Sequence, residues 1–350
     1  MPPMTFMNPI KWLACLVLLA TAYSAYAEEA TVDEGERRAQ RAGASLIGKP
    51  GPDARLTTID GEHIDLSQLY GKKPVYLKFW ATWCVPCRQQ MPGFEEVQQT
   101  LGDDIQIIAV NTGFSDDLDS VRAYRKELGL TMPIVVDDGS LAAALNLRVT
   151  PQHVLIGRDG RIAHVGHLDD PQLHAALKRI REVGTTTVAT SPSDTTEATR
   201  RFNVGDQVEG LRLTTLEGTE VSLGQGAGKG RALVFFAPWC EPYLAESRPQ
   251  TSQACQRVRE DVNKLAAQSG LDWLGVSSGL WTSKEDLQDY KNTTDTHLPL
   301  ALDEDDALFR AFGVRDIPSV VLIDAQGRVA QVLGPQDTQL AEALNAISPR

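Results

Sequence analysis

The sequence predicts two α/β domains in tandem, each with a mixed central sheet flanked by helices. At 350 residues, the chain is long enough for two domains of ordinary size. Three blocks of sequence recur in the same order, and a repeat of this length indicates a duplicated domain rather than a solenoid unit. The paired blocks are ARLTTIDGEHIDL (54–66) with LRLTTLEGTEVSL (211–223), KFWATWC (78–84) with VFFAPWC (234–240), and VTPQHVLIGRDGRIAHV (149–165) with DIPSVVLIDAQGRVAQV (316–332).

Each copy alternates between strand-like and helix-like segments. Short apolar runs predict strands, and the aromatic-rich ones are typical of a sheet centre. Apolar residues at helical spacing predict two helices per copy, and apolar runs around a D-G or Q-G turn predict a final hairpin. The order strand, helix, strand, helix, hairpin gives a mixed sheet. The expected strands are 74–80, 105–110, 232–237 and 272–277, the helices 87–101, 117–128, 252–268 and 283–291, and the hairpins 153–165 and 319–332.

The N-terminus has the pattern of a secretory signal. Lys11 precedes the apolar run WLACLVLLATAYSA (12–25), and AYA (25–27) supplies small residues for a cleavage site. The run is shorter than the roughly 20 apolar residues of a membrane-spanning helix. We therefore predict a signal peptide at 1–27 and an exported protein. The alternative is an uncleaved signal that keeps the protein associated with a membrane.

Two polar segments flank the first expected domain. Residues 28–44 are charged and have almost no large apolar side chains, which predicts a solvated leader or a frayed helix. The stretch TTTVATSPSDTTEAT has nine Ser or Thr in fifteen residues and predicts a linker at 184–201. The domains are then expected at 45–183, with a C-x-x-C motif, and at 202–350, with a degenerate copy of it.

Composition narrows the classes of partner. The net charge is -12 at pH 7 and no basic tract is present, so we do not expect nucleic acid as a partner. Four cysteines follow the expected signal, too few for a disulfide-stapled scaffold. In an exported chain, a close cysteine pair favours redox chemistry over zinc binding, and the His residues do not complete a tetrahedral zinc site. We expect no metal or other cofactor.

The candidate site is the WCVPC segment of the first copy. A strand that enters it and a helix that leaves it place Cys84 at the helix N-terminus, where free backbone N–H groups and the helix dipole stabilise a thiolate. Cys87 lies one turn on, close enough for a disulfide, and Pro86 suits the first helical turn. Trp83 can shield the pair from water. C-x-x-C also occurs in zinc half-sites and structural pairs, so spacing alone does not decide the chemistry.

The motif and its surroundings resemble TlpA/ResA-type periplasmic thioredoxins. The resemblance is carried by FWATWCVPC (79–87), by Thr150-Pro151 before an apolar strand, and by the lead-in GKPGPDARLTTIDGEHIDLSQLYGKKPV (48–75). It covers about 46–183 with specific motifs and 202–348 more loosely. It implies that both domains are thioredoxin-like.

The resemblance also implies residue roles. Cys84 is expected to attack, Cys87 to resolve, and Pro151 to be a cis-proline facing the disulfide. Thr150 is expected to offer its backbone to an incoming peptide, with Trp83 beside it as a further substrate contact.

Two positions depart from the family pattern. Lys78 stands where the family often carries Asn or Asp, six residues before the first cysteine. A buried cation there would favour the thiolate and make the disulfide more oxidising, but we expect Lys78 to extend to the surface. Gln90 replaces a frequent Glu, so the pH dependence of the family is not carried over.

The second copy reads WCEPY, with Tyr243 in place of the second cysteine. Cys240 keeps the helix-start position, and Cys255 is its only candidate partner. Fifteen residues of continuous helix span about 22 Å, beyond disulfide reach, so we do not expect a pair, although Pro249 could bend the chain. We interpret this half as a catalytically silent domain; the alternatives are a monothiol trap and an inert buried thiol.

The sequence therefore predicts a periplasmic thiol–disulfide oxidoreductase with a Cys84/Cys87 dithiol. The resemblance implies a reductase of partner protein disulfides, for instance in cytochrome c maturation, with electrons from a DsbD-like membrane donor. The near alternative is a DsbA-like oxidase or isomerase. A non-enzymatic alternative is a scaffold or a copper carrier that uses both cysteines and His153. Peroxidase activity is not favoured, because Ala81 and Leu77 stand where peroxiredoxins place Thr and Pro.

Overall fold

The computed structural model describes residues 33–182, 200–224 and 228–347. The expected signal peptide and nearly all of the expected linker lie outside the described residues. Within those ranges, no helix combines the length and the apolar character needed to cross a membrane.

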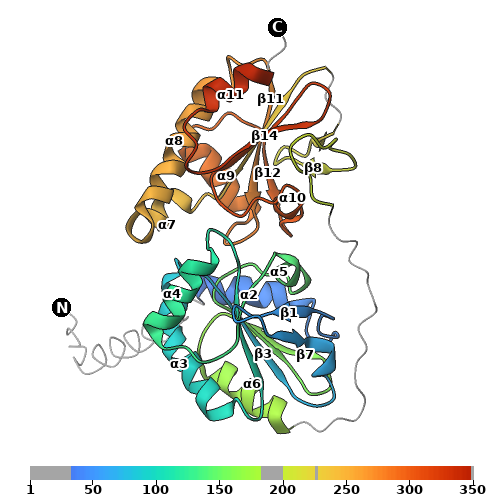
Figure 1. The fold of residues 1–350 in the computed structure, drawn as a ribbon, viewed down its shortest axis with the longest axis vertical. Coiled ribbons are helices and arrows are strands. Elements are labelled where there is room, and N and C mark those ends of the chain that lie inside the picture. The colour runs from blue at the N-terminus through green and yellow to red at the C-terminus, as the bar shows by residue number, and fades with distance from the viewer. Residues whose placement is uncertain (1–32, 183–199, 225–227, 348–350) are drawn as a thin grey trace, which may run out of the picture.

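The N-terminal half is built on a five-stranded mixed sheet with the order β5-β4-β3-β6-β7 (Figure 1). Strand β3 pairs in parallel with β4 and antiparallel with β6; β4–β5 is parallel and β6–β7 antiparallel. All six residues of β3 are buried, because helices cover the sheet. The strands are β3 (Val75–Trp80), β4 (Gln106–Asn111), β5 (Ile134–Val136), β6 (Gln152–Ile156) and β7 (Ile162–Gly166).

Helices and a small hairpin complete this half. The hairpin of β1 (Arg55–Thr57) and β2 (His63–Asp65) leads through a 3-10 turn, η1 (Leu66–Gln68), into β3. The helices are α3 (Val85–Leu101), α4 (Leu118–Leu128), α5 (Ser140–Ala144) and α6 (Pro171–Glu182).

The C-terminal half repeats this topology, with the sheet order β12-β11-β10-β13-β14 and the same pattern of parallel and antiparallel pairs. The prediction of two mixed α/β domains is confirmed. Its strands are β8 (Arg212–Thr214), β9 (Glu220–Ser222), β10 (Arg231–Phe236), β11 (Asp272–Ser278), β12 (Leu300–Asp303), β13 (Ser319–Ile323) and β14 (Val329–Leu333). Its helices are α7 (Cys240–Ser247), α8 (Pro249–Leu265), α9 (Lys284–Thr293), α10 (Ala307–Ala311) and α11 (Leu340–Ile347).

Residues 33–44, the described part of the charged segment, are not a solvated leader. Residues Glu34–Ala44 form helix α2, capped by the Asp33 side chain, and α2 packs on β7. Small residues make the close approach possible: a Cβ at Gly43 would lie 2.5 Å from the side chain of Val165. The helix alternative is confirmed, but the expectation of a solvated or frayed segment was wrong because it rested on the lack of large apolar residues, whereas this helix buries Gly and Ala.

Glu36 ties α2 to the end of β7. Its side chain is buried and accepts the backbone N–H groups of His167 at 2.7 Å and Leu168 at 3.0 Å. Glu36→Ala should lower the free energy of unfolding by about 2–3 kcal/mol, because two N–H groups lose their acceptor. Urea unfolding would measure this, with the exposed Glu34→Ala as control. Equal stability of the two variants would contradict the assignment of α2 to the folded core.

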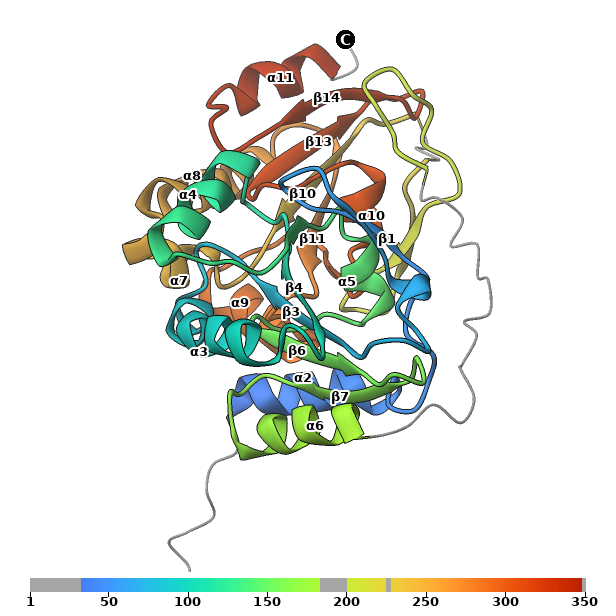
Figure 2. The same ribbon diagram turned by 60° about the horizontal axis from the view of Figure 1, so that its bottom comes forward.

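The two halves lie against each other (Figures 1 and 2). The loops that follow their central strands meet: Trp83, after β3, stacks on Trp239, after β10, with ring centroids 5.1 Å apart. A stacked aromatic pair of this kind contributes stabilising free energy beyond that of the apolar area it buries. Aromatic and polar groups make this junction, and the cysteine motifs of both copies lie beside it.

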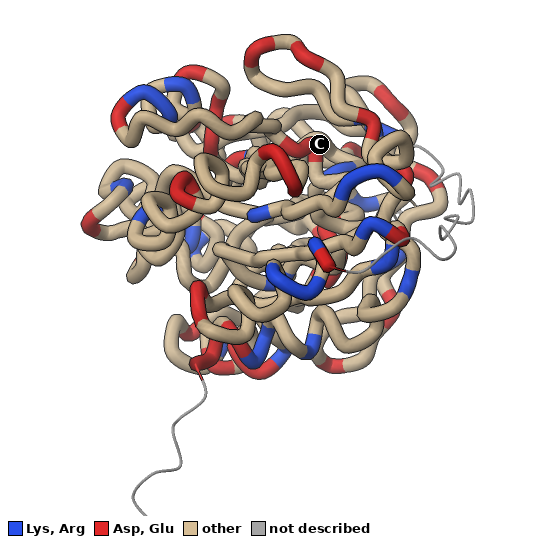
Figure 3. Tube along the Cα trace, turned by 90° about the horizontal axis from the view of Figure 1, so that it is seen from below, with Lys and Arg blue, Asp and Glu red and all other residues tan. Residues whose placement is uncertain are grey.

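Seen from below, basic and acidic positions are interspersed along the trace (Figure 3).

Candidate active site

Cys84 and Cys87 form a disulfide where β3 passes into α3. Cys84 is the N-cap of α3, and its Sγ accepts the backbone N–H of Cys87 at 3.2 Å. Pro86 lies in the first turn, where its missing N–H leaves no bond unmade. After reduction, the same N–H and the helix dipole would stabilise a thiolate on Cys84. The expected close pair is present, and its position suits an attacking sulfur.

The peptide bond between Thr150 and Pro151 is cis, as the family resemblance implies. The carbonyl oxygen of Thr150 lies 3.4 Å from Cys84 Sγ, so this loop forms one wall of the site. Both Cys84 and Thr150 are almost fully buried. The loop before β6 thus meets the start of α3, because β6 is antiparallel to β3 and begins at the end of the sheet where β3 finishes.

Lys78 is buried in β3, 1% exposed, and the expectation that it reaches the surface was wrong. Its Nζ donates to the backbone oxygen of Gln90 at 3.2 Å and lies 5.1 Å from the centre of the Phe94 ring. Burial lowers its pKa to about 7, partly offset by the charge of Asp169. The side chain cannot reach water because β3 is the central strand of the sheet and α3 covers it.

His153 faces the same layer beneath α3. Its Nδ1 is 2.8 Å from the hydroxyl of Tyr76 and its Nε2 is 3.0 Å from Oε1 of Gln90. Burial and the charge of Lys78 hold the pKa of His153 well below its ordinary value. Both ring nitrogens are engaged, and the described ranges contain no group of three His, Cys, Asp or Glu placed to hold a metal. Nothing in the described chain therefore supports a copper carrier that uses His153.

The second copy also contains a disulfide, Cys240–Cys255. The expectation that these residues lie too far apart was wrong, since it assumed one continuous helix. Helix α7 ends at Ser247, Arg248 leaves helical geometry, and α8 starts at Pro249 and packs back on α7. The two Cα atoms are 6.3 Å apart. The alternatives of a monothiol trap and of an inert free thiol do not hold for this bonded pair.

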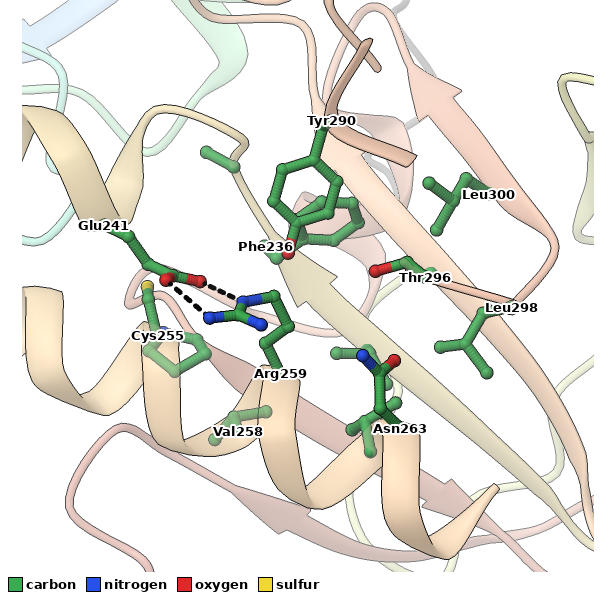
Figure 4. A pocket seen from close by; sticks show the side chains of 15 residues that line it. Phe236, Glu241, Cys255, Val258, Arg259, Asn263, Tyr290, Thr296, Leu298 and Leu300 are labelled. Atoms are coloured by element: carbon green, nitrogen blue, oxygen red, sulfur yellow. Dashed lines mark hydrogen bonds and ion pairs between the residues drawn. The ribbon is translucent and has the colours of Figure 1, made fainter. Parts of the chain in front are cut away.

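A small cavity lies beside this second disulfide (Figure 4). Its volume is about 30 Å³, room for a water-sized molecule. Glu241 and Arg259 form a bidentate ion pair at its edge, with bonds of 2.7 and 3.0 Å. Cys255 lines the cavity, whereas Cys240 is fully buried. The C-terminal disulfide therefore lies inside the domain, beside a cavity too small for a partner polypeptide.

Three aromatic residues of the C-terminal half complete the surroundings of Cys84, and sequence reasoning did not assign them to the site. Trp239 stacks on Trp83; the hydroxyl of Tyr243 accepts the backbone N–H of Val85 at 3.0 Å; the indole N–H of Trp281 lies 3.4 Å from Oγ1 of Thr150. The duplication offered a signal for two of them, because Trp239 and Tyr243 occupy the positions of Trp83 and Cys87 in the repeat. Trp281 has no comparable signal.

Comparisons with known proteins agree with this geometry. Residues 47–165 match the family model described as AhpC/TSA family, and residues 202–347 match the one described as Redoxin. Thioredoxin-like protein YneN of Bacillus subtilis (strain 168) is 34% identical over 171 residues, which are 48% of this chain and 96% of that protein. The chain belongs to the TlpA/ResA-like thioredoxin family. Thiol-disulfide oxidoreductase ResA of Bacillus anthracis is 32% identical over 138 residues, 38% of this chain and 78% of ResA.

A solved structure, that of a putative protein disulfide isomerase from Bacteroides thetaiotaomicron, is 34% identical; it covers 39% of this chain and 88% of its own, with a TM-score of 0.35. This TlpA/ResA-like thioredoxin is a redox enzyme of the thiol–disulfide oxidoreductase class. The C-x-x-C pair at Cys84 and Cys87 is the part of the site that such exchange requires.

Proposed function

We propose that this protein reduces disulfides of partner proteins in the periplasm through the Cys84/Cys87 dithiol. The observation that carries the proposal is the disulfide at the start of α3, beside the cis-Pro151 loop. We further propose that the C-terminal domain is non-catalytic, because Tyr243 replaces the second cysteine of the motif and the Cys240–Cys255 pair is buried within the domain.

The exchange balances in two steps. The Cys84 thiolate attacks one sulfur of the partner disulfide, which gives a mixed disulfide and releases a partner thiolate. The Cys87 thiolate then attacks Cys84 Sγ, which releases the second partner thiol and leaves the Cys84–Cys87 disulfide seen here. Two electrons from a DsbD-like membrane dithiol would restore the reduced enzyme.

The location rests on the sequence of 1–27, whose pattern is that of a secretory signal. An uncleaved signal would instead hold the enzyme at the membrane. We propose periplasmic protein thiols and disulfides as partners, with cytochrome c maturation as one setting. Nucleic acid is not proposed, since the net charge is -12 and no basic tract is present.

Lys78 favours a second candidate, a DsbA-like oxidase. Lys78 is buried in β3, the strand that leads into the motif, and a charged ammonium there would stabilise the thiolate and so the reduced form, which makes the disulfide more oxidising. The reduction potential separates the two: about -270 mV, as in thioredoxin, supports a reductase, whereas about -120 mV, as in DsbA, supports an oxidase.

Cys87→Ser should trap partner proteins as mixed disulfides at Cys84, because the resolving thiol is lost. Mass spectrometry of periplasmic extracts would identify the linked cysteine. The matched control is the double variant Cys84→Ser/Cys87→Ser, which should trap nothing. Equal trapping by both variants, or captured proteins linked to Cys240, would mean that Cys84 is not the reactive sulfur and would refute the proposal.

A further inference from the structure

We propose that the C-terminal domain is a built-in competitor of partner proteins: it occupies the face around Cys84, and a partner gains access only when it is displaced. This inference rests on the proposed function, since it concerns the regulation of the same site. It also assigns a regulatory function to the degenerate copy, which we propose is not catalytic.

The first observation is burial. Cys84 is 1% exposed and Trp83 3% exposed, and Thr150 is fully covered. A partner sulfur must approach Cys84 Sγ along the line of the disulfide bond to exchange with it, and in this conformation no surface remains for that approach. A protein substrate is excluded until the cover moves.

Tyr243 supplies the second observation. It stands where the repeat would place a second cysteine, and its hydroxyl accepts the N–H of Val85, one of the N–H groups at the start of α3 that lack an intrahelical partner. Its ring lies edge-on to Trp83, with centroids 6.3 Å apart. A cysteine side chain is too short to make these contacts. The Cys-to-Tyr difference therefore removes the exchange chemistry of the second copy and adds a contact to the first.

Trp281 occupies the other side of the site. Its backbone N–H donates to the carbonyl of Arg148 at 2.8 Å, and its ring packs edge-on against His167 at 5.5 Å. Trp281 has a φ of 55°, a left-handed conformation that costs energy for a bulky residue. The backbone of the C-terminal domain thus takes hydrogen-bonding positions next to the cis-proline loop, where the polypeptide of a partner is expected to lie.

Polar contacts hold the cover and also allow it to open. Arg248, between α7 and α8, pairs with the buried carboxylate of Asp116 at 2.9 Å. Asp116 also accepts from the backbone of Thr82 and from Asn111, so it stays hydrogen-bonded if Arg248 leaves. On the other side, Arg38 of α2 pairs with Asp286 of α9 at 2.7 Å. Water can solvate these charges after separation, whereas the aromatic contacts of Trp239 with Trp83 and Phe114 must also be broken for the cover to move.

The rim offers a starting point for displacement. Val85 is 49% exposed and Tyr243 39% exposed, so the contact between them lies at the edge of the covered face. The rate with a partner then equals the intrinsic rate multiplied by the fraction of molecules that are open.

The test compares full-length variants that weaken the cover. Tyr243→Ala, Trp281→Ala and Arg248→Gln each remove the contacts that one side chain makes with the covered face, and none of them alters a cysteine. The control is Val332→Ala, which truncates a side chain on β14 of similar exposure, 41%, to Tyr243. The measured quantity is the second-order rate at which the Cys84–Cys87 disulfide is reduced, by reduced thioredoxin as a protein-sized dithiol and by dithiothreitol as a small one, with alkylation and mass spectrometry to locate the thiols.

We expect each cover variant to react about tenfold faster than the wild type with reduced thioredoxin, with a smaller gain for dithiothreitol, and no change in Val332→Ala. Circular dichroism and the integrity of Cys240–Cys255 check that the variants are folded. Wild-type rates in all three cover variants, or slower ones, would overturn the inference while the proposed function stands. A pair that neither reagent reduces in any variant would refute the proposed function itself.

Discussion

Replacement of Lys78 with methionine should raise the free energy of unfolding by about 3 kcal/mol at pH 6, and this gain should disappear toward pH 11. Lys78 is 1% exposed, and burial lowers its pKa from an ordinary 10.5 to about 7. The folded protein therefore bears the cost of a buried ammonium at acidic pH. Methionine fills a similar volume without a charge.

The sign follows from proton uptake. Between pH 7 and 10.5 the unfolded chain binds a proton at Lys78 that the folded chain does not, so the wild type gains stability as pH rises through this window. Below pH 7 Lys78 is protonated in both the folded and the unfolded chain, and the loss of folding stability caused by the buried charge reaches its full value of at most about 5 kcal/mol. Loss of the bond from Nζ to the Gln90 oxygen subtracts about 1 kcal/mol from the gain of the variant.

Hydrogen exchange of the β3 amides over pH 6 to 8, together with urea unfolding up to pH 11, would measure the difference. The control is Lys126→Met, at an exposed position on α4, which should shift stability little at any pH. A Lys78→Met effect that does not vary with pH would mean that the ammonium is solvated in the folded state.

The sequence predicted those features whose cause is local. The C-x-x-C spacing next to a strand and a helix is enough to bring Cys84 and Cys87 together, and the repeat is enough to give two sheets of the same order. The cis bond before Pro151 came from the family resemblance and is present. These features depend on neighbours in the chain or on a pattern shared with relatives.

The predictions that failed for Lys78 and for α2 share a different cause, since both depend on contacts with segments that are distant in the sequence. Lys78 is buried because α3 lies over the central strand. Helix α2 is ordered because its small residues fit against β7, and it has no helical stripe of large apolar residues from which this packing could be predicted. Strand β5 has only three residues, Ile134–Val136, too short for a periodic pattern.

The cover on the active site is the clearest example of this limit. Trp83 was expected to contact substrates, and in the folded chain it contacts Trp239 instead. Nothing in one copy of the repeat says which face the other copy will meet. Pairing of the two motifs requires the tertiary arrangement, in which the loops after β3 and β10 meet through Trp83 and Trp239.

Removal of the second disulfide should destabilise the C-terminal domain by about 3 kcal/mol and should not abolish exchange at Cys84. The Cys240–Cys255 bond closes a loop of 15 residues, and in the chain-entropy account such a cross-link restricts the unfolded state by that amount. Both sulfurs lie between α7 and α8, so the double variant Cys240→Ala/Cys255→Ala should loosen the turn at Arg248 first.

Hydrogen exchange of the α7 and α8 amides would report this loss without requiring the two domains to unfold together. The matched comparison is Cys84→Ala/Cys87→Ala, whose bond closes a much shorter loop and should cost about 2 kcal/mol in the other domain. In a Cys87→Ser background, the C-terminal double variant should still trap partners at Cys84. Unchanged protection of α8 together with lost trapping would instead make Cys240–Cys255 a participant in the exchange, because a structural staple affects stability while a redox partner affects electron flow.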